Sequence, residues 1–237
     1  MPNKTITAPG STVAVNILKN GTNYADVRNA TAGTNAGNAD TKFTLNAKSG
    51  SNYFIRRGML LYDFSTVDIP RGVKVLRAHL VLNDVSESAA QGTGDMIRVS
   101  WIDSPNTFGG IHANDYNRNR TSTDTATSAQ SVNNGADGEI IQLDRPNLLI
   151  QLAHALNNRT WLHLCIRNQL DWSGTTPTGM NKVWFDRPNA DDNPLQLVVY
   201  YAIDDLKTNI GSGANGRASN SGFGGANIFA GTSSGFA

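Results

Sequence analysis

The sequence predicts an all-β fold, an antiparallel β-sandwich, from two blocks of strand-like residues and the turns that join them. In the first block, an apolar segment from residue 56, a turn at Ile69–Gly72 and an alternating segment over 73–82 follow one another. The second block, 183–201, holds two more apolar segments, predicted to be the last two strands of the same sheet system. Alternation at period two indicates strands with one buried face, and short turns containing Gly and Pro favour antiparallel neighbours.

The N-terminal part of the chain predicts three strands separated by polar residues. Residues 12–18 alternate at period two and form the first expected strand, and a loop over 20–40 follows. A short strand is expected over 41–46 and a long one over 53–64. Gly58 predicts a bulge in the long strand, because a glycine inside a strand often marks one.

The segment 73–82 is the clearest strand in the sequence. Its predicted core face is formed by Leu76, Ala78, Leu80 and Leu82. The opposite face is formed by Val75, Arg77, His79 and Val81. Another strand is expected over 97–102, and the polar stretch 105–135 is expected to be a long loop of functional importance.

One short amphipathic helix is predicted after the strand at 139–143. Asp144 is its expected N-cap, Pro146 lies in its first turn and 157–158 end it. Its apolar stripe contains Leu148, Leu149, Leu152 and Leu156. We expect this helix to cover one end of the sandwich.

The rest of the domain is predicted to be a buried strand, a loop and the two closing strands. The buried strand covers 161–167 and contains the single cysteine, Cys165, which we interpret as a small buried hydrophobic residue. The loop over 170–181 holds Trp172, and the closing strands cover 183–185 and 195–201.

After residue 202 the composition changes to Gly, Ser, Asn and Ala. We therefore predict two parts, a sandwich domain over 1–202 and an extended C-terminal arm over 203–237. The arm is too poor in apolar residues to fold alone, so we expect a partner to order it. Its expected anchors are Ile210, Phe223, Ile228, Phe229 and Phe236.

Charge and targeting signals restrict the function. The chain has 20 Lys and Arg against 19 Asp and Glu, so no concentrated basic surface is expected for nucleic acid. We expect no membrane segment, since no apolar stretch approaches the ~20 residues that span a bilayer. We also expect no secretory signal at the N-terminus. The protein would then be made in the cytoplasm of a host cell.

No catalytic or metal-binding motif is recognisable, so an enzyme is not expected. The four histidines lie in different elements without metal-ligand spacing. Residues 191–193 (Asp, Asp, Asn) could supply oxygen ligands to Ca²⁺, and no other cofactor is expected. Trp172 and Tyr116 are the candidates for an aromatic platform that stacks on sugars. Paired carboxylates for polysaccharide cleavage are a more distant alternative.

Two groups of residues resemble the jelly-roll modules called DNRLRE domains, which are related to alginate-type carbohydrate-binding modules. The first group is Arg57, Leu61–Phe64, Ile69–Gly72 and Ala78–Leu82. The second group is Trp184–Arg187 followed by Pro194–Tyr200. The resemblance covers about residues 10–202 and implies an antiparallel jelly-roll β-sandwich. Jelly-roll modules without secretion signals are also found in tailed-phage particles.

The function expected from these features is that of a non-enzymatic structural protein of a bacteriophage virion. It would decorate or cement the capsid, or belong to the tail, and would assemble through its C-terminal arm. Its expected partners are other virion proteins or copies of itself. The alternative is a carbohydrate-binding module that recognises a host surface polysaccharide.

Overall fold

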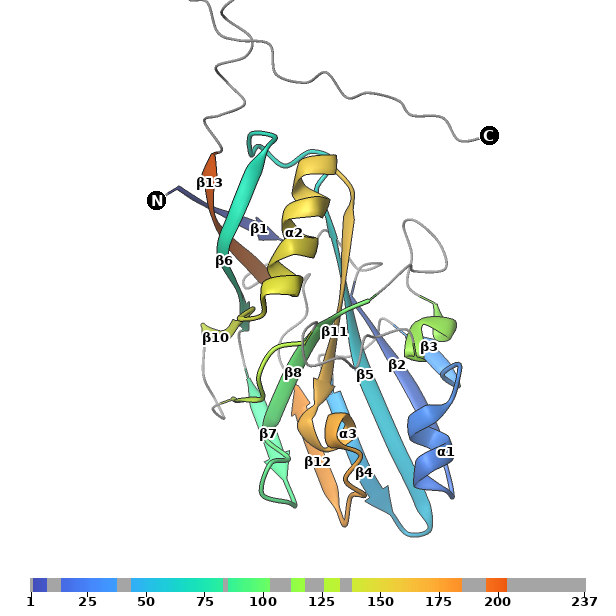
Figure 1. Cartoon of the computed structure of the whole chain (residues 1–237). Helices are drawn as coiled ribbons and strands as arrows, with labels where there is room; N and C mark the ends of the chain where they lie inside the picture. The colour runs from blue at the N-terminus through green and yellow to red at the C-terminus, as the bar shows by residue number, and fades with distance from the viewer. Residues whose placement is uncertain are drawn as a thin grey trace, which may run out of the picture. The chain divides into compact units, whose positions relative to one another are not determined.

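A computed structural model describes residues 2–7, 14–37, 44–82, 85–102, 112–117, 126–132, 138–184 and 195–203. The chain divides after residue 204 into two units, and the second unit, 205–237, lies outside the described residues. All strand pairs of the described residues are antiparallel, in two sheets that form a curled sandwich, which confirms the predicted all-β class (Figure 1). No helix among the described residues is long and apolar enough to cross a bilayer.

The larger sheet has nine strands. Seven follow the order β7 (Ser86–Ala89), β12 (Met180–Trp184), β4 (Thr44–Ser49), β5 (Asn52–Asp63), β11 (Trp161–Asn168), β8 (Met96–Trp101) and β9 (Gln130–Ser131). The other two are β2 (Ala14–Gly21), which pairs with β5, and β3 (Asn35–Gly37), which pairs with β2. The register of β2 with β5 is continuous on both sides of Gly58, and that of β11 is continuous from Asp63 to Gly58, so the predicted bulge there is wrong.

The smaller sheet has four strands. Their order is β1 (Asn3–Thr7), β13 (Gln196–Ile203), β6 (Val73–Leu82) and β10 (Glu139–Gln142). The two closing strands of the sequence, β12 and β13, therefore belong to different sheets rather than to one. The chain crosses from one layer of the sandwich to the other between them.

The predicted core face of β6 holds only for its second half. Ala78, Leu80 and Leu82 are buried, whereas Leu76 is 37 % exposed and Val75 is buried. The cause is an irregularity opposite Tyr200 and Tyr201, which pair with Arg77 and Val75 and leave Leu76 without a partner in the register. One extra residue in a strand reverses the alternation of its side chains, so the inward positions change parity there.

Four helices occur in the described residues, although one was predicted. They are α1 (Tyr24–Asn29), the 3-10 helix η1 (Ala113–Asn117), α2 (Pro146–Asn158) and α3 (Gln169–Ser173). Trp172 therefore lies in a short helix and not in a loop. Segments of five or six residues are too short to show helical periodicity in the sequence.

Helix α2 is the predicted amphipathic helix; it ends at Asn158 as predicted, but its N-cap is not Asp144. Its N-cap is Arg145, whose guanidinium has no acceptor atom and makes no cap bond, and the Asp144 carboxylate accepts from the Ser128 amide. Its last helical residue is Asn158, and Arg159 then adopts a left-handed conformation with φ of 56°. On the apolar stripe, Leu149 is only partly buried, and the other three predicted leucines are buried.

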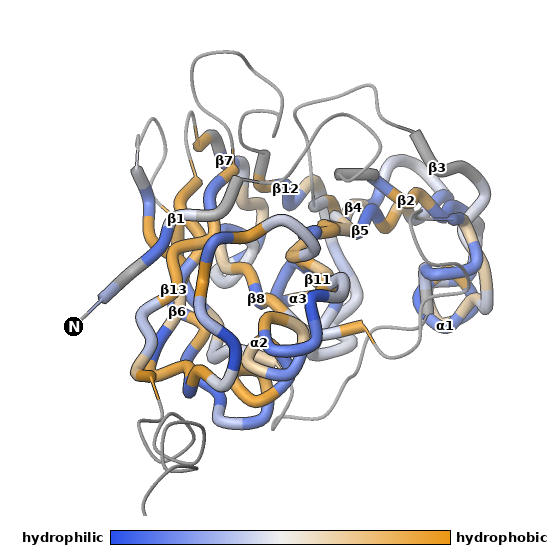
Figure 2. Tube along the Cα trace, turned by 90° about the horizontal axis from the view of Figure 1, so that it is seen from above, coloured by the Kyte–Doolittle hydropathy of each residue, from blue (hydrophilic) through white to orange (hydrophobic). Residues whose placement is uncertain are grey.

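Two cores lie on the two faces of the larger sheet. The main core joins both sheets and α2, and hydrophobic stretches of β6, β13 and α2 lie next to one another in Figure 2. The second core contains Met59, Leu61 and Cys165 of the sheet, packed with residues of α1 and η1. Since neighbours along β5 alternate between the two cores, this strand is buried on both faces along most of its length.

Candidate functional site

A buried cluster of charges is the most distinctive arrangement of polar side chains in the described structure. Arg57 of β5 and Arg167 of β11 each donate two hydrogen bonds to Asp171 of α3, from Nε to Oδ2 at 2.8 Å and from Nη2 to Oδ1 at 2.9 Å. All three side chains are at most 2 % exposed. Burial alone would raise the pKa of Asp171, but Arg167 and Arg57 hold it well below its usual range.

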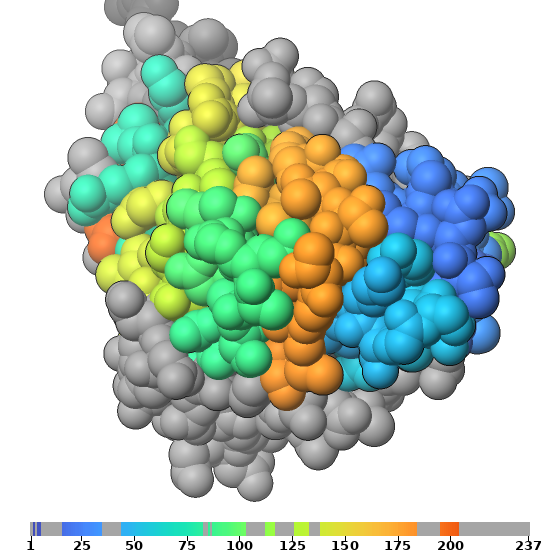
Figure 3. Space-filling view, turned by 90° about the horizontal axis from the view of Figure 1, so that it is seen from below, coloured from blue at the N-terminus to red at the C-terminus, as the bar shows by residue number. Residues whose placement is uncertain are grey.

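The same cluster fixes the short helices by their main chains. Arg57 donates to the carbonyl oxygens of Tyr116 at 2.6 Å and Arg28 at 2.9 Å. Arg28 in turn donates from Nε to the Asp171 carbonyl and from Nη2 to that of Trp172. Seen from below, the surface of α1 adjoins that of the chain around α3 (Figure 3). These contacts identify the cluster as a structural device that ties α1, η1 and α3 to the sheet.

The predicted sugar platform of Trp172 and Tyr116 is not formed. Tyr116 is fully buried, its ring lies 4.0 Å from the Arg57 guanidinium carbon, and its hydroxyl donates to the Val27 carbonyl. Trp172 is partly exposed, and its ring lies within 5.4 Å of the guanidinium carbons of Arg98 and Arg167. Tyr116 therefore has no free face for a sugar, and the expectation for it is wrong.

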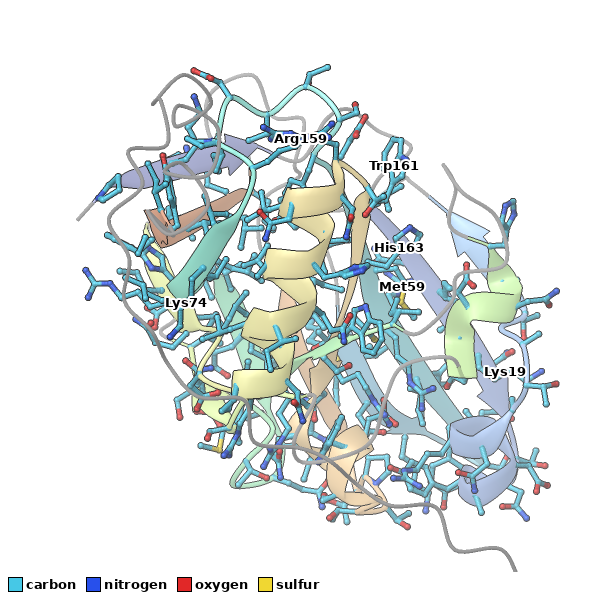
Figure 4. The ribbon with its side chains drawn as sticks, turned by 45° about the horizontal axis from the view of Figure 1, so that its top comes forward. Lys19, Met59, Lys74, Arg159, Trp161 and His163 are labelled. Carbon is cyan, nitrogen blue, oxygen red and sulfur yellow. The ribbon has the colours of Figure 1, made fainter. Side chains whose placement is uncertain are left out.

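His163 and Cys165 lie beside one another on β11 in the second core. Figure 4 shows His163 near Met59 of the neighbouring strand β5. Burial lowers the pKa of His163 to about 4, against an opposing effect of Asp115, and its Nε2 has no hydrogen-bond partner in the described structure. Burial also raises the pKa of the Cys165 thiol to about 12. A protonated, buried thiol is a poor nucleophile, which agrees with the predicted structural role of Cys165.

A row of side chains with two cations crosses one face of the larger sheet. Lys182, Leu45, Arg56 and Leu18 are partners in register on β12, β4, β5 and β2. Lys182, Leu45 and Arg56 line a shallow cavity of about 190 Å³ together with Met180, which is 48 % exposed, and Thr44. The Arg56 Nε is buried without a hydrogen-bond partner among the described residues. No pattern in the sequence identified this row, because its members are far apart along the chain.

Most exposed large apolar side chains of the described residues belong to the smaller sheet and α2. Five large hydrophobic residues of the described structure are exposed, and four of them lie in the smaller sheet or in α2: Leu76, Ile140, Ile150 and Ile203. A groove of about 280 Å³ separates α2 from the first half of β6. Lys74 lies at this place on β6 (Figure 4), and Ile150, 58 % exposed, lies on α2.

The remaining predicted sites lie outside the described residues. These are the five arm anchors Ile210, Phe223, Ile228, Phe229 and Phe236, and the candidate Ca²⁺ ligands at 191–193. Within the described residues, no group of three or more His, Cys, Asp or Glu side chains could hold a metal ion.

Comparison with known proteins adds no family to this description. No protein-family model matches the chain, and no curated protein matches it.

Proposed function

We propose that this protein is a non-enzymatic structural protein of a bacteriophage virion, and that its C-terminal segment, residues 203–237, binds neighbouring copies or other virion proteins. One observation carries the proposal: four of the five exposed large apolar side chains of the described residues lie on the smaller sheet and α2, and the chain leaves the described domain from this sheet at Ile203. Clusters of exposed apolar residues mark surfaces that bind other proteins.

The composition of the C-terminal segment supports the same function. It supplies spaced aromatic residues in a context of Gly, Ser and Asn. Such a segment contributes binding energy mainly by burying its aromatic side chains in pockets of a partner. The charged residues of the domain that are most deeply buried hold its own helices in place, so they are not available to such a partner.

Deletion of residues 208–237 tests this proposal. The truncated protein and the full chain would be expressed in cells that produce the particle, and purified particles would be probed for each. We expect the full chain in the particles and the truncated protein only in the soluble fraction, with an unchanged circular dichroism spectrum. Equal incorporation of both proteins would refute the assembly role of this segment.

The row of Lys182, Leu45 and Arg56 favours a second candidate function, carbohydrate binding. Its cavity combines cationic hydrogen-bond donors with the apolar surface of Met180, and polar sugars require both kinds of contact. This surface replaces the platform expected from Trp172 and Tyr116.

A glycan array with the full chain and two variants tests the second function. Arg56→Ala should abolish any binding that the wild-type protein shows. Lys48→Ala is the matched control, since Lys48 is exposed on β4 and alternation places it on the opposite face from Leu45. The carbohydrate-binding function would be refuted if the wild-type protein bound no glycan. It would also be refuted if Arg56→Ala bound glycans like the wild-type protein.

A further inference from the structure

The groove between α2 and β6 has the size and lining of a binding site for one large apolar side chain. Its floor and walls include Val75 of β6 and Leu149, Ile150 and Ala153 of α2, and Lys74 and Asp144 add a charge of each sign. The groove exists because β10 pairs with β6 only over residues 79–82, so the first half of β6 has α2 as its neighbour instead of a strand. Its volume of about 280 Å³ is suited to a single aromatic ring rather than to a long ligand.

The C-terminal segment begins beside this groove. In the register of the smaller sheet, Ala202 pairs with Lys74 and Ile203 with Val73. The 34 residues that follow include Phe223 and Phe236, each surrounded by small or polar residues, and Phe229, which follows Ile228. The end of the described domain that carries the groove is therefore also the end from which the aromatic segment departs.

The segment is long enough to reach another copy. Phe223 is the twentieth residue after Ile203, and twenty residues of chain span at most about 70 Å. A compact domain of this size has a radius of gyration of about 17 Å. The nearest phenylalanine can thus reach past its own domain to the same groove of a neighbour, and the two later ones reach farther.

We propose that the groove between α2 and β6 receives a phenylalanine of residues 204–237 from a neighbouring copy of this chain. The proposal rests on the assembly function above and names the receiving surface. Each copy carries both the groove and the segment, so one contact repeats from copy to copy. A single ring in a shallow groove binds weakly, and assembly gains its strength from repetition of the contact at high local concentration.

Photo-crosslinking of the full chain tests which surface is used. The photoreactive residue p-benzoylphenylalanine would be placed at position 223, 229 or 236, and cross-linked peptides would be mapped by mass spectrometry. For at least one position we expect cross-links between two chains, to peptides that contain residues 74–75 or 146–153. Cross-links confined to one chain, or to other peptides, would overturn the proposal.

A pair of isoleucine variants provides an independent measurement. Ile150→Asp places a charge in the groove, whereas Ile140→Asp places one on β10, where the isoleucine is exposed to a similar degree, 47 % against 58 %. By sedimentation velocity, we expect Ile150→Asp to weaken self-association at least ~tenfold and Ile140→Asp to leave it unchanged, because only Ile150 lines the groove. Thermal melts of both variants identify any loss that arises from unfolding.

The outcomes separate this inference from the assembly function. If the full chain and the chain without 208–237 sediment alike and are equally incorporated into particles, the assembly function fails. If they differ, but Ile150→Asp associates like the wild-type protein, the segment binds another surface and only the groove proposal fails.

Discussion

The two places where helices pack on the sheets are held in opposite ways. On the larger sheet, the helices α1 and α3 have five or six residues and are fixed by the guanidinium groups around Asp171. On the smaller sheet, α2 has thirteen residues and is fixed mainly by a buried stripe that includes Leu148, Leu152 and Leu156. The helices on the larger sheet are therefore held by buried ion pairs and hydrogen bonds. The smaller sheet and α2 are held by apolar packing and leave other apolar residues exposed.

The difference follows from the length of the helices. A helix of one or two turns buries too few side chains to offset the entropy of ordering it, so directed hydrogen bonds must fix its main chain. A helix of three or more turns can bury a complete stripe and still carry other apolar residues on its exposed face, as Ile150 does. The end of the molecule with apolar packing is therefore the better candidate for contacts with other proteins.

Removal of the shared carboxylate should have the largest effect. In Asp171→Asn, two fully buried guanidinium groups lose their counterion, and we expect the free energy of unfolding to fall by about 3–5 kcal/mol. Urea denaturation measures the change. The control is Asp144→Asn, because Asp144 is exposed and lies 3.8 Å from Arg145, and surface pairs of this kind contribute about 0–1 kcal/mol. If the free energy of unfolding falls by the same small amount in both variants, the Asp171 cluster does not stabilise the packing of α1 and α3 on the larger sheet.

The stability of the protein should depend on pH because His163 is buried in the second core. The pKa of His163 in the folded protein is about 4, below the ordinary value, so the unfolded chain takes up a proton first as the pH falls. Stability should decline by about 3 kcal/mol between pH 6.5 and pH 4. Asp171 adds little to this decline, because its carboxyl in the unfolded chain takes up a proton only near pH 4; with its pKa lowered in the folded protein, its contribution is lost mainly below pH 4.

Two histidine variants test whether His163 causes this decline of stability with falling pH. His163→Gln should flatten the decline measured by denaturation at successive pH values. His154→Gln should retain the decline, since His154 is exposed on α2. A slope that persists in His163→Gln would mean that another group is responsible for it.

The smallest of these effects concerns the open edge of β6. The Asn157 side chain accepts from the amides of Gly72 and Val73 and donates to the Val73 carbonyl, so it substitutes for a strand at that edge. Asn157→Ala should cost about 1–2 kcal/mol in thermal or urea denaturation. The adjacent Asn158→Ala is the control, because within the part of the chain that the structure describes its side chain bonds inside α2, to the His154 carbonyl. Equal effects of the two substitutions would show that this edge needs no such bond.

The sequence predicted the strands that alternate clearly and missed the elements that depend on distant partners. The segment 73–82 was predicted with the bounds of β6 because its alternation is local. Helices α1 and α3 were missed because Arg57, which bonds to both, lies on a strand 29 residues from Arg28 and 114 residues from Asp171. The same reason explains why Tyr116 was interpreted as an exposed aromatic residue although Arg57 covers it.

The sequence by itself determined the all-β class, the buried position of Cys165, the main strands and the helix at α2, since hydrophobic periodicity is a property of neighbouring residues. Only the tertiary structure decided that Leu76 points outward, that Asp171 joins two buried arginines, and that Lys182, Leu45 and Arg56 form one row. These features depend on the register between strands and on contacts across more than a hundred residues, and no local pattern encodes either.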